Sequence, residues 1–257
     1  MMTMDKHQIA DLLLEAQRTG IALDPSLRQP FTLEEAYEVQ KCVAEKKIKQ
    51  GNKMIGKKIG FTSQAMRDAL GIDQPDYGNL FSDAIYPQGV PMQRDRFIIP
   101  KVEGEIAFLL KDDIKGPNCT AYDVIKATEG VIACLEFIDS RWGAGFSFYD
   151  SISNNGSCGG FMLGSKMLKL DRLDLRHVGL YMTKNGKLVN SALGVEVMGD
   201  PINAVVWLAN QMAEHGTYLK AGEVILSGSL VAAVPVEKGD CMSISFTHFG
   251  TMEICFE

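Results

Sequence analysis

The chain has 257 residues, of which 46% are hydrophobic and 23% charged, and its formal net charge is −6. This length allows one large core or two small ones, the acidic balance argues against a nucleic-acid or anionic-membrane surface, and no apolar run approaches the ~20 residues of a membrane helix. The six cysteines are scattered without a CxxC pair, so we expect a reduced, cytoplasmic protein without a structural zinc site.

The first fifty residues carry helical patterns. Apolar residues recur at helical spacing between Ile9 and Ala16. Thr32 and Glu35 have the spacing of a capping box, which predicts the start of a second helix. We therefore expect a helical N-terminal region over residues 1–52, followed by a β-rich region over residues 53–257.

In that second region, short apolar runs alternate with glycine and proline turns, which is typical of strands. The predicted strands cover residues 54–61, 96–99, 103–110, 131–138, 160–163, 180–183, 224–226, 241–246 and 252–256, with hairpin turns at 185–186 and 238–240. Helices are predicted after Ser63, near Thr120 and at Pro201, which Asp200 would cap. Because strands and helices do not alternate strictly, we expect an α+β fold with a mixed or antiparallel sheet rolled toward a barrel.

Lys58 lies in a glycine-rich run, Gly-Lys-Lys-Ile-Gly-Phe-Thr-Ser, over residues 56–63. In a strand it shares a face with Gly56 and Gly60, which leave space that a ligand could fill. A partly desolvated lysine beside a metal can have a lowered pKa and take part in proton transfer. The alternative is a surface lysine on a strand weakened by glycine.

Three segments of small and polar residues follow. In residues 74–80, proline, aspartate and glycine predict a tight turn, which Asp76 would stabilise through its side chain. Residues 150–161, which contain Ser157, could present backbone N–H groups to a carboxylate ligand or form a flexible surface loop. Residues 222–230 could line the same pocket or pack tightly. Ser157 lacks a GxSxG elbow, which argues against a serine-hydrolase triad.

Three glutamates form the strongest chemical signal. Glu103 and Glu105 are separated by one residue in a predicted strand, so both carboxylates lie on one face. Glu136 is the single charge in an apolar strand, where a glutamate needs a cation as partner. Three carboxylates together suit Mg²⁺ or Mn²⁺. Alternatively, the first two are solvated and Glu136 pairs with Arg141 or a lysine.

Six segments in order resemble the 2-keto-4-pentenoate hydratase family, within the fumarylacetoacetate hydrolase-like superfamily. They are GKKIGFTS (56–63), GIDQPDYG (71–78), VEGEIAFLLKDDIKGP (102–117), LEFIDSR (135–141), NNGSCGGFMLG (154–164) and AGEVILSGSL (221–230). The resemblance covers nearly the whole chain. One departure is Gly156, which stands before Ser157 where the family pattern has alanine, and it puts the shape of the pocket beside the substrate in question.

The resemblance implies a barrel-like core of the fumarylacetoacetase C-terminal type over residues 53–257. It also implies Mg²⁺ or Mn²⁺, a homo-oligomer (pentamer or decamer) that can associate with a pathway enzyme, and hydration of 2-hydroxypenta-2,4-dienoate to 4-hydroxy-2-oxopentanoate in meta-cleavage degradation of aromatic compounds. The family's site residues fall on Glu103, Glu105 and Glu136 as metal ligands, Lys58 and Asp76 as catalytic residues, and Ser157 as a substrate-binding residue.

Three other functions stay open. A sister enzyme on the same scaffold, 4-oxalocrotonate decarboxylase, also uses a metal-chelated 2-oxo acid as electron sink. Hydrolases of the superfamily cleave acylpyruvates with a His–Glu pair, for which the sequence offers no convincing histidine. A catalytically silent partner subunit is the third alternative, and the complete set of carboxylates and lysine argues against it.

Overall fold

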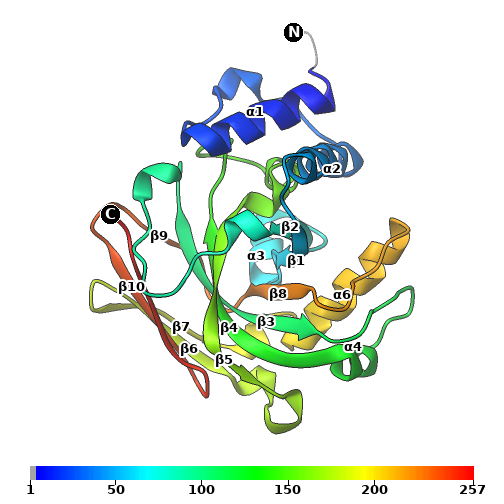
Figure 1. Cartoon of the computed structure of the whole chain (residues 1–257), viewed down its shortest axis with the longest axis vertical. Coiled ribbons are helices and arrows are strands. Elements are labelled where there is room, and N and C mark those ends of the chain that lie inside the picture. The colour runs from blue at the N-terminus through cyan, green and yellow to red at the C-terminus, as the bar shows by residue number, and fades with distance from the viewer. Residues whose placement is uncertain (1–3) are drawn as a thin grey trace.

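The computed structural model describes residues 4–257. Within them, two β-sheets and six α-helices form the fold. Figure 1 shows the larger sheet as a strongly curved layer, with α1 and α2 above it and the smaller sheet to one side. The predicted α+β class with a mixed sheet is confirmed. The described sheets do not close into a barrel, however: one sheet curves, and the second packs beside it.

The helices mostly follow the predicted patterns. They are α1 (Lys6–Thr19), α2 (Leu33–Lys49), α3 (Gln64–Leu70), α4 (Ala121–Ala127), α5 (Phe148–Ser153) and α6 (Pro201–Glu214). The capping box of Thr32 and Glu35 is present, and Asp200 caps α6. Only α5 was not predicted, because its six residues are too few to show a helical apolar period. No helix within residues 4–257 is long and apolar enough to cross a membrane.

The larger sheet has the order β2-β1-β8-β3-β4-β5, with β9 paired to β3. Only the β1–β8 pair is parallel among these pairs, so the sheet is mixed. The smaller sheet has the order β11-β10-β6-β7. The strands are β1 (Met54–Gly60), β2 (Asp76–Phe81), β3 (Lys101–Leu110), β4 (Thr128–Ile138), β5 (Cys158–Leu168), β6 (Gly179–Lys184), β7 (Lys187–Leu193), β8 (Val224–Ser229), β9 (Val234–Pro235), β10 (Cys241–Phe246) and β11 (Gly250–Cys255).

Two local predictions were wrong in ways that matter for the site. Residues 76–81 form β2 where a tight turn was predicted, because this segment pairs with β1 along its length. Asp76 is the first residue of β2 and lies opposite Gly60. The predicted strand over residues 96–99 is irregular, because the Asp139 carboxylate accepts the N–H groups of Ile98 and Ile99. Pairing across the sheet and side-chain capping override local propensity in these places.

The predicted hairpin turns had different outcomes. Asn185 and Gly186 join β6 to β7, a strand the sequence patterns had not revealed. Residues 238–240 form a turn, but its flanking strands pair elsewhere: β9 with β3, and β10 with β6 and β11. Cys241 and Cys255 face each other across β10 and β11 and form a disulfide, in contrast to the expected fully reduced chain.

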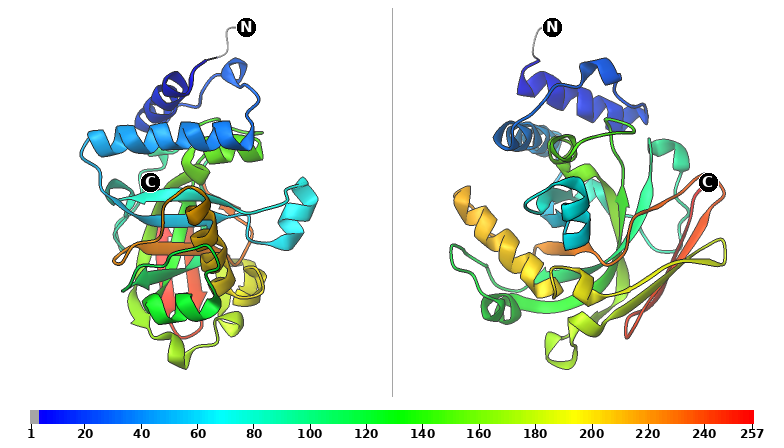
Figure 2. Two further views of the ribbon diagram at one scale, coloured as in Figure 1. Left: turned by 90° about the vertical axis from the view of Figure 1, so that its right-hand side faces the viewer. Right: turned by 180° about the vertical axis from the view of Figure 1, so that it is seen from behind.

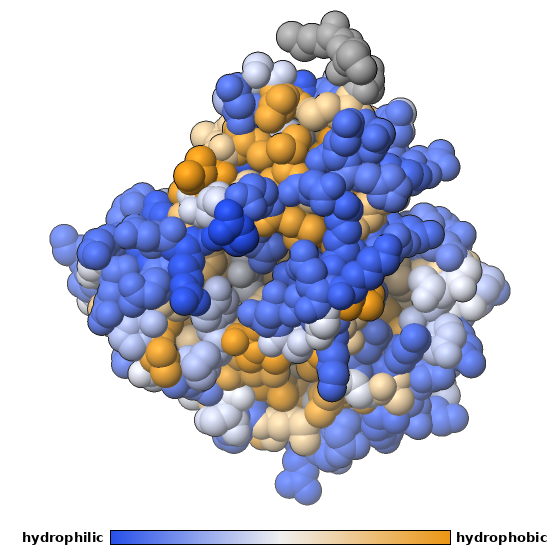
Figure 3. Space-filling model, turned by 45° about the horizontal axis from the view of Figure 1, so that its top comes forward, coloured by the Kyte–Doolittle hydropathy of each residue, from blue (hydrophilic) through white to orange (hydrophobic). Residues whose placement is uncertain are grey.

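Apolar side chains form separate clusters that support the larger sheet. The main core lies between the two sheets and against α6. A second cluster joins α1 and α2 to Trp142 and to Ile152 of α5, and thereby fixes α5 beneath the N-terminal helices. The two further views in Figure 2 show these helices stacked at one end of the molecule. Figure 3 shows that apolar side chains gather at this end between polar ones. The division of the chain at residue 52 remains a prediction.

Candidate active site

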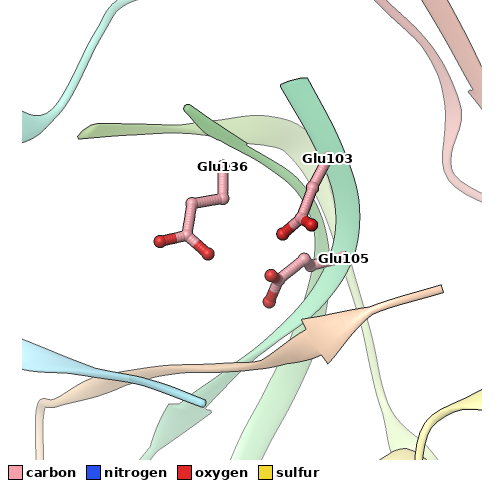
Figure 4. A group of neighbouring side chains, drawn as sticks. All are labelled: Glu103, Glu105 and Glu136. Atoms are coloured by element: carbon pink, nitrogen blue, oxygen red, sulfur yellow. The ribbon is translucent and has the colours of Figure 1, made fainter. Parts of the chain in front are cut away.

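Three carboxylates converge on the inner face of the curved sheet. Antiparallel pairing places Glu103 of β3 directly opposite Glu136 of β4, and Glu105 follows two residues along β3 on the same face. One oxygen from each of the three lies within 4.8 Å of the others. Figure 4 shows the three side chains pointing toward a common point from the two strands. Like charges directly opposite on a sheet repel one another, so this arrangement needs a cation.

The buried carboxylate oxygens have few hydrogen-bond partners. Glu105 and Glu136 are fully buried, yet Oε1 of Glu105 and both oxygens of Glu136 accept no hydrogen bond from residues 4–257. The exception is Glu105 Oε2, which accepts from the Gly228 backbone N–H at 2.8 Å. Buried polar atoms are rarely left unpaired unless a ligand satisfies them. Oxygen-only donors in this number fit a hard divalent cation such as Mg²⁺ or Mn²⁺.

Burial and mutual repulsion disfavour the charged form of all three glutamates. Burial, followed by the charge of Glu136, raises the pKa of Glu103 to about 8. Burial and the charges of Glu136 and Glu103 raise the pKa of Glu105 well above its usual range. Burial also raises the pKa of Glu136, although Lys58 opposes it. Without a cation, these carboxyl groups therefore hold protons at pH values where free carboxylates are ionised.

Lys58 reaches this group from β1. Its Nζ lies 3.5 Å from Glu136 Oε1 and donates to the Gly156 carbonyl oxygen at 2.9 Å. Burial lowers the pKa of Lys58, but Glu136, Asp76 and the other carboxylates together raise it above its usual value. The expectation of a lowered pKa is therefore not met among these carboxylates, and the Lys58 amino group keeps its proton. A divalent cation held by the glutamates would oppose the rise.

Asp76 occupies the space over Gly60. A Cβ added at Gly60 would lie 2.2 Å from Asp76 Oδ1 and 3.2 Å from Lys58 Nζ, so the missing side chain makes room for both groups. A Cβ at Gly56 would lie 1.8 Å from the Val224 carbonyl oxygen, so this glycine allows the close approach of β8. The two glycines that flank Lys58 thus serve neighbouring protein groups, and neither leaves an open space for a ligand.

Ser157 lies in a 3-10 turn (Asn155–Ser157) that packs against β1 and β2. Its hydroxyl donates to Ser151 Oγ at 3.2 Å, and Ser151 Oγ donates to Asp76 Oδ2 at 3.3 Å. All three side chains are buried. The hydroxyl of Ser157 is thus connected to Asp76 by two hydrogen bonds through Ser151 of α5.

All six predicted site residues lie on adjoining elements around one region of the inner face. The sequence had marked the segments 150–161 and 222–230, but it predicted no individual role for Ser151, the Gly156 carbonyl group or the Gly228 N–H group within them. Gly228 belongs to the small-residue segment that had been expected to line the pocket or to pack tightly, and it contacts Glu105. Nothing in the sequence pattern marks Ser151, because its contact depends on the position of α5.

Comparison with known proteins places this geometry in a family. Residues 46–257 match the family described as "Fumarylacetoacetate (FAA) hydrolase C-terminal". The chain belongs to the fumarylacetoacetate hydrolase C-terminal family. The fold and the resemblance inferred from the sequence motifs agree with this membership.

Several members of the fumarylacetoacetate hydrolase family are similar over nearly their whole length. The 2-oxo-hept-4-ene-1,7-dioate hydratase of Escherichia coli is 39% identical, over 98% of this chain and 99% of its own. The 2-keto-4-pentenoate hydratase of Paraburkholderia xenovorans (strain LB400) is 34% identical, over 100% and 97%. Among solved structures, the 4-oxalocrotonate decarboxylase of Pseudomonas putida G7, complexed with magnesium and adipate, has a TM-score of 0.94 at 33% identity, covering 98% of this chain and 97% of that chain.

Proposed function

We propose that the protein is a metal-dependent hydratase that adds water to 2-hydroxypenta-2,4-dienoate to give 4-hydroxy-2-oxopentanoate, in the meta-cleavage degradation of aromatic compounds. The observation that carries the proposal is the convergence of Glu103 with the buried Glu105 and Glu136, with Lys58 Nζ 3.5 Å from Glu136. The names of the hydratase relatives support the same reaction.

The proposed metal ligands are Glu103, Glu105 and Glu136, which together fit the ion, and the unpaired oxygens of Glu105 and Glu136 support this assignment. When bound, Mg²⁺ or Mn²⁺ would supply Lewis-acid polarisation of the substrate carboxylate and its C2 oxygen. Structures of the sister decarboxylase complexed with magnesium and with calcium support a divalent ion at this site.

Lys58 and Asp76 are the proposed proton carriers. Because Lys58 is protonated, its ammonium group can donate to the C2 oxygen as negative charge develops there. Loss of the C2 hydroxyl proton and gain of a proton at C5 first convert the dienol into 2-oxopent-3-enoate, which has a C2 carbonyl group and a C3–C4 double bond. Asp76 then accepts a proton from the water whose oxygen bonds to C4, while the electrons of the C3–C4 double bond move toward the C2 carbonyl group. Protonation at C3 then restores the 2-oxo acid, so that one water is added in total. Ser157 as a substrate-binding residue stays a prediction.

A turnover assay tests the proposal. Purified protein is incubated with 2-hydroxypenta-2,4-dienoate after treatment with a chelator and after re-addition of Mn²⁺ or Mg²⁺. We expect loss of the dienoate and formation of 4-hydroxy-2-oxopentanoate only with the metal. Absence of product under all metal conditions would overturn the hydratase assignment. Absence of Mn²⁺ binding in isothermal titration would favour the silent-subunit alternative.

The second candidate function is decarboxylation of 4-oxalocrotonate. The similarity to the 4-oxalocrotonate decarboxylase structure favours it, since the same chelated 2-oxo acid can accept electrons when CO₂ leaves. Incubation with 4-oxalocrotonate, followed by measurement of CO₂, separates the two reactions. Cleavage of acylpyruvates by a His–Glu pair has no support, because all four histidines (His7, His177, His215 and His248) are exposed.

We also propose that the protein is a cytoplasmic homo-oligomer that can associate with a neighbouring enzyme of its pathway. Leu188 and Leu193 of the edge strand β7 and Tyr181 of the neighbouring β6 are exposed, which supports contact between subunits. Mass measurement in solution tests the oligomer, and a monomer at micromolar concentration would contradict it.

A further inference from the structure

A chain of buried hydrogen bonds connects α5 to Asp76. Asn154 Nδ2 donates to the Asp139 carbonyl oxygen at 3.2 Å and lies 3.5 Å from Ser157 Oγ. The Ser157 hydroxyl donates to Ser151, and Ser151 donates to Asp76 Oδ2. The hydroxyl–oxygen distances of 3.2 and 3.3 Å are long for such bonds. Catalytic hydrogen bonds are commonly long before substrate is bound.

The chemistry of its last member fixes the direction of this chain, because a carboxylate oxygen of Asp76 can only accept a hydrogen bond. The amide nitrogen of Asn154 can only donate, so the oxygen of Ser157 accepts from it. The proton of Ser157 is then directed to Ser151, and the proton of Ser151 to Asp76. A carboxylate oxygen at the far end accepts, as the chain requires. The hydroxyl of Ser157 is therefore committed to Ser151 in this arrangement.

Ser151 holds Asp76 in one orientation. Asp76 is fully buried, and its Oδ1 accepts no hydrogen bond within the described residues. Its Oδ2 accepts from Ser151, which leaves Oδ1 directed over Gly60, on the side where Lys58 Nζ also lies. The packing of Ile152 beneath the N-terminal helices anchors α5 and thereby supports the position of the Ser151 hydroxyl.

We propose that Ser151 is a positioning residue, which with Ser157 orients the Asp76 carboxylate for the proton transfers of the hydration. This inference rests on the proposed function, because it assigns Ser151 a part in that reaction. Ser151 acts through Asp76, so its removal changes the rate of the chemical step, and the substrate is bound as before.

The matched variants are Ser151→Ala and Ser153→Ala in the full-length protein with Mn²⁺. Both remove a buried hydroxyl from α5, but Ser153 accepts from Trp142 Nε1 and donates to the Asp150 carbonyl oxygen, away from Asp76. We expect Ser151→Ala to lower kcat about tenfold, the effect of losing one hydrogen bond to a charged group, with KM changed less than about twofold. Ser153→Ala should lower the melting temperature and leave kcat unchanged.

A double-mutant cycle with Asp76→Asn decides whether Ser151 acts through Asp76. We expect Ser151→Ala to have no further effect on kcat once Asp76 is Asn. The inference would be overturned if Ser151→Ala had equal effects in both backgrounds, or if Ser151→Ala alone had a wild-type kcat. In either case, hydration of the dienoate by the wild-type protein would leave the proposed function intact. Failure of the wild-type protein to hydrate the dienoate under any metal condition would instead overturn the proposed function.

Discussion

Lys57 and Lys58 are adjacent residues on opposite faces of β1. Both side chains are buried, but their surroundings differ. Lys57 is 8% exposed and Lys58 is 3% exposed. On one face, Lys57 Nζ lies 3.1 Å from Met54 Sδ and 3.7 Å from Glu223 Oε1. On the other face, Lys58 lies among Asp76 and the three glutamates. The first face thus offers one carboxylate, and the second offers four.

This difference reverses the direction of the pKa shift. Burial lowers the pKa of both lysines, and at Lys57 the attraction of Glu223 does not compensate for it. At Lys58 the carboxylates outweigh burial and raise the pKa. The comparison teaches that the excess of carboxylates, and not burial itself, gives the inner face its chemistry. Each of the following predictions changes one side of this comparison.

The largest effect is expected from removing the two ammonium groups in turn. Lys58→Met should lower kcat for hydration of 2-hydroxypenta-2,4-dienoate about 10³-fold, because it removes the proton donor beside the glutamates. Lys57→Met should keep kcat within about threefold of wild type, because its contacts lie on the opposite face. Steady-state kinetics with Mn²⁺ measures both. Equal losses in the two variants would mean that the faces do not differ in function.

The second effect concerns the carboxylates that face the two lysines. Glu105→Gln should lower Mn²⁺ affinity and kcat by about 100-fold, since even outer partners of metal ligands contribute about 10–100-fold. The fold should be retained, because the side chain keeps its size. Glu223→Gln, beside Lys57, is the control and should bind Mn²⁺ as wild type does. Isothermal titration measures affinity. Wild-type turnover and affinity in Glu105→Gln would refute the metal assignment.

Much of this inner face could be predicted from the sequence. The alternation of side chains along a strand was enough to place Glu103 and Glu105 together, and the single charge within residues 131–138 indicated Glu136. The register that sets Glu103 opposite Glu136 could not be predicted, because it depends on how two strands pair. The family resemblance carried by the ordered motifs indicated that the glutamates of these two strands belong to one metal site.

Asp76 and Ser151 show where sequence patterns were insufficient. The proline and glycine around Asp76 favour a turn locally, whereas pairing with β1 makes this segment a strand. Ser151 lies on a helix of only six residues, without a long apolar period to reveal it. Its contact with Asp76 arises from packing between segments 75 residues apart in the chain. Such contacts follow from the assembled fold.

A smaller effect is expected from filling the space over Gly60. In Gly60→Ala the added Cβ would lie 2.2 Å from Asp76 Oδ1, so the carboxylate must move. We expect kcat to fall about tenfold, since small displacements of catalytic groups are costly. Gly179→Ala in the smaller sheet is the control, because its Cβ would meet only side-chain atoms, Thr247 Oγ1 at 3.0 Å and Leu193 Cδ2 at 3.7 Å, away from Asp76. Full activity of Gly60→Ala would show that the position of Asp76 is not critical.

The smallest effect is the pH dependence of metal stabilisation. In the metal-free protein, the pKa of Glu103 is raised to about 8 from a usual value of 4.5. The folded state then binds more protons than the unfolded state between these values, so the free energy of unfolding decreases as pH rises through this window. Metal binding requires the ionised carboxylates and strengthens over the same window.

The increase in melting temperature caused by Mn²⁺ should therefore grow from pH 5 to pH 8 and level off above it. At a free Mn²⁺ concentration of about 100 times Kd, stabilisation of about 3 kcal/mol corresponds to an increase of roughly 5–10 °C. Thermal unfolding with and without Mn²⁺ at several pH values measures the shift. Glu223→Gln should behave as wild type, whereas Glu105→Gln should show a small shift at every pH. A shift in the wild-type protein that is independent of pH would mean that the inner carboxylates are already ionised without metal, and that the electrostatic contrast between the two faces of β1 is smaller than the geometry indicates.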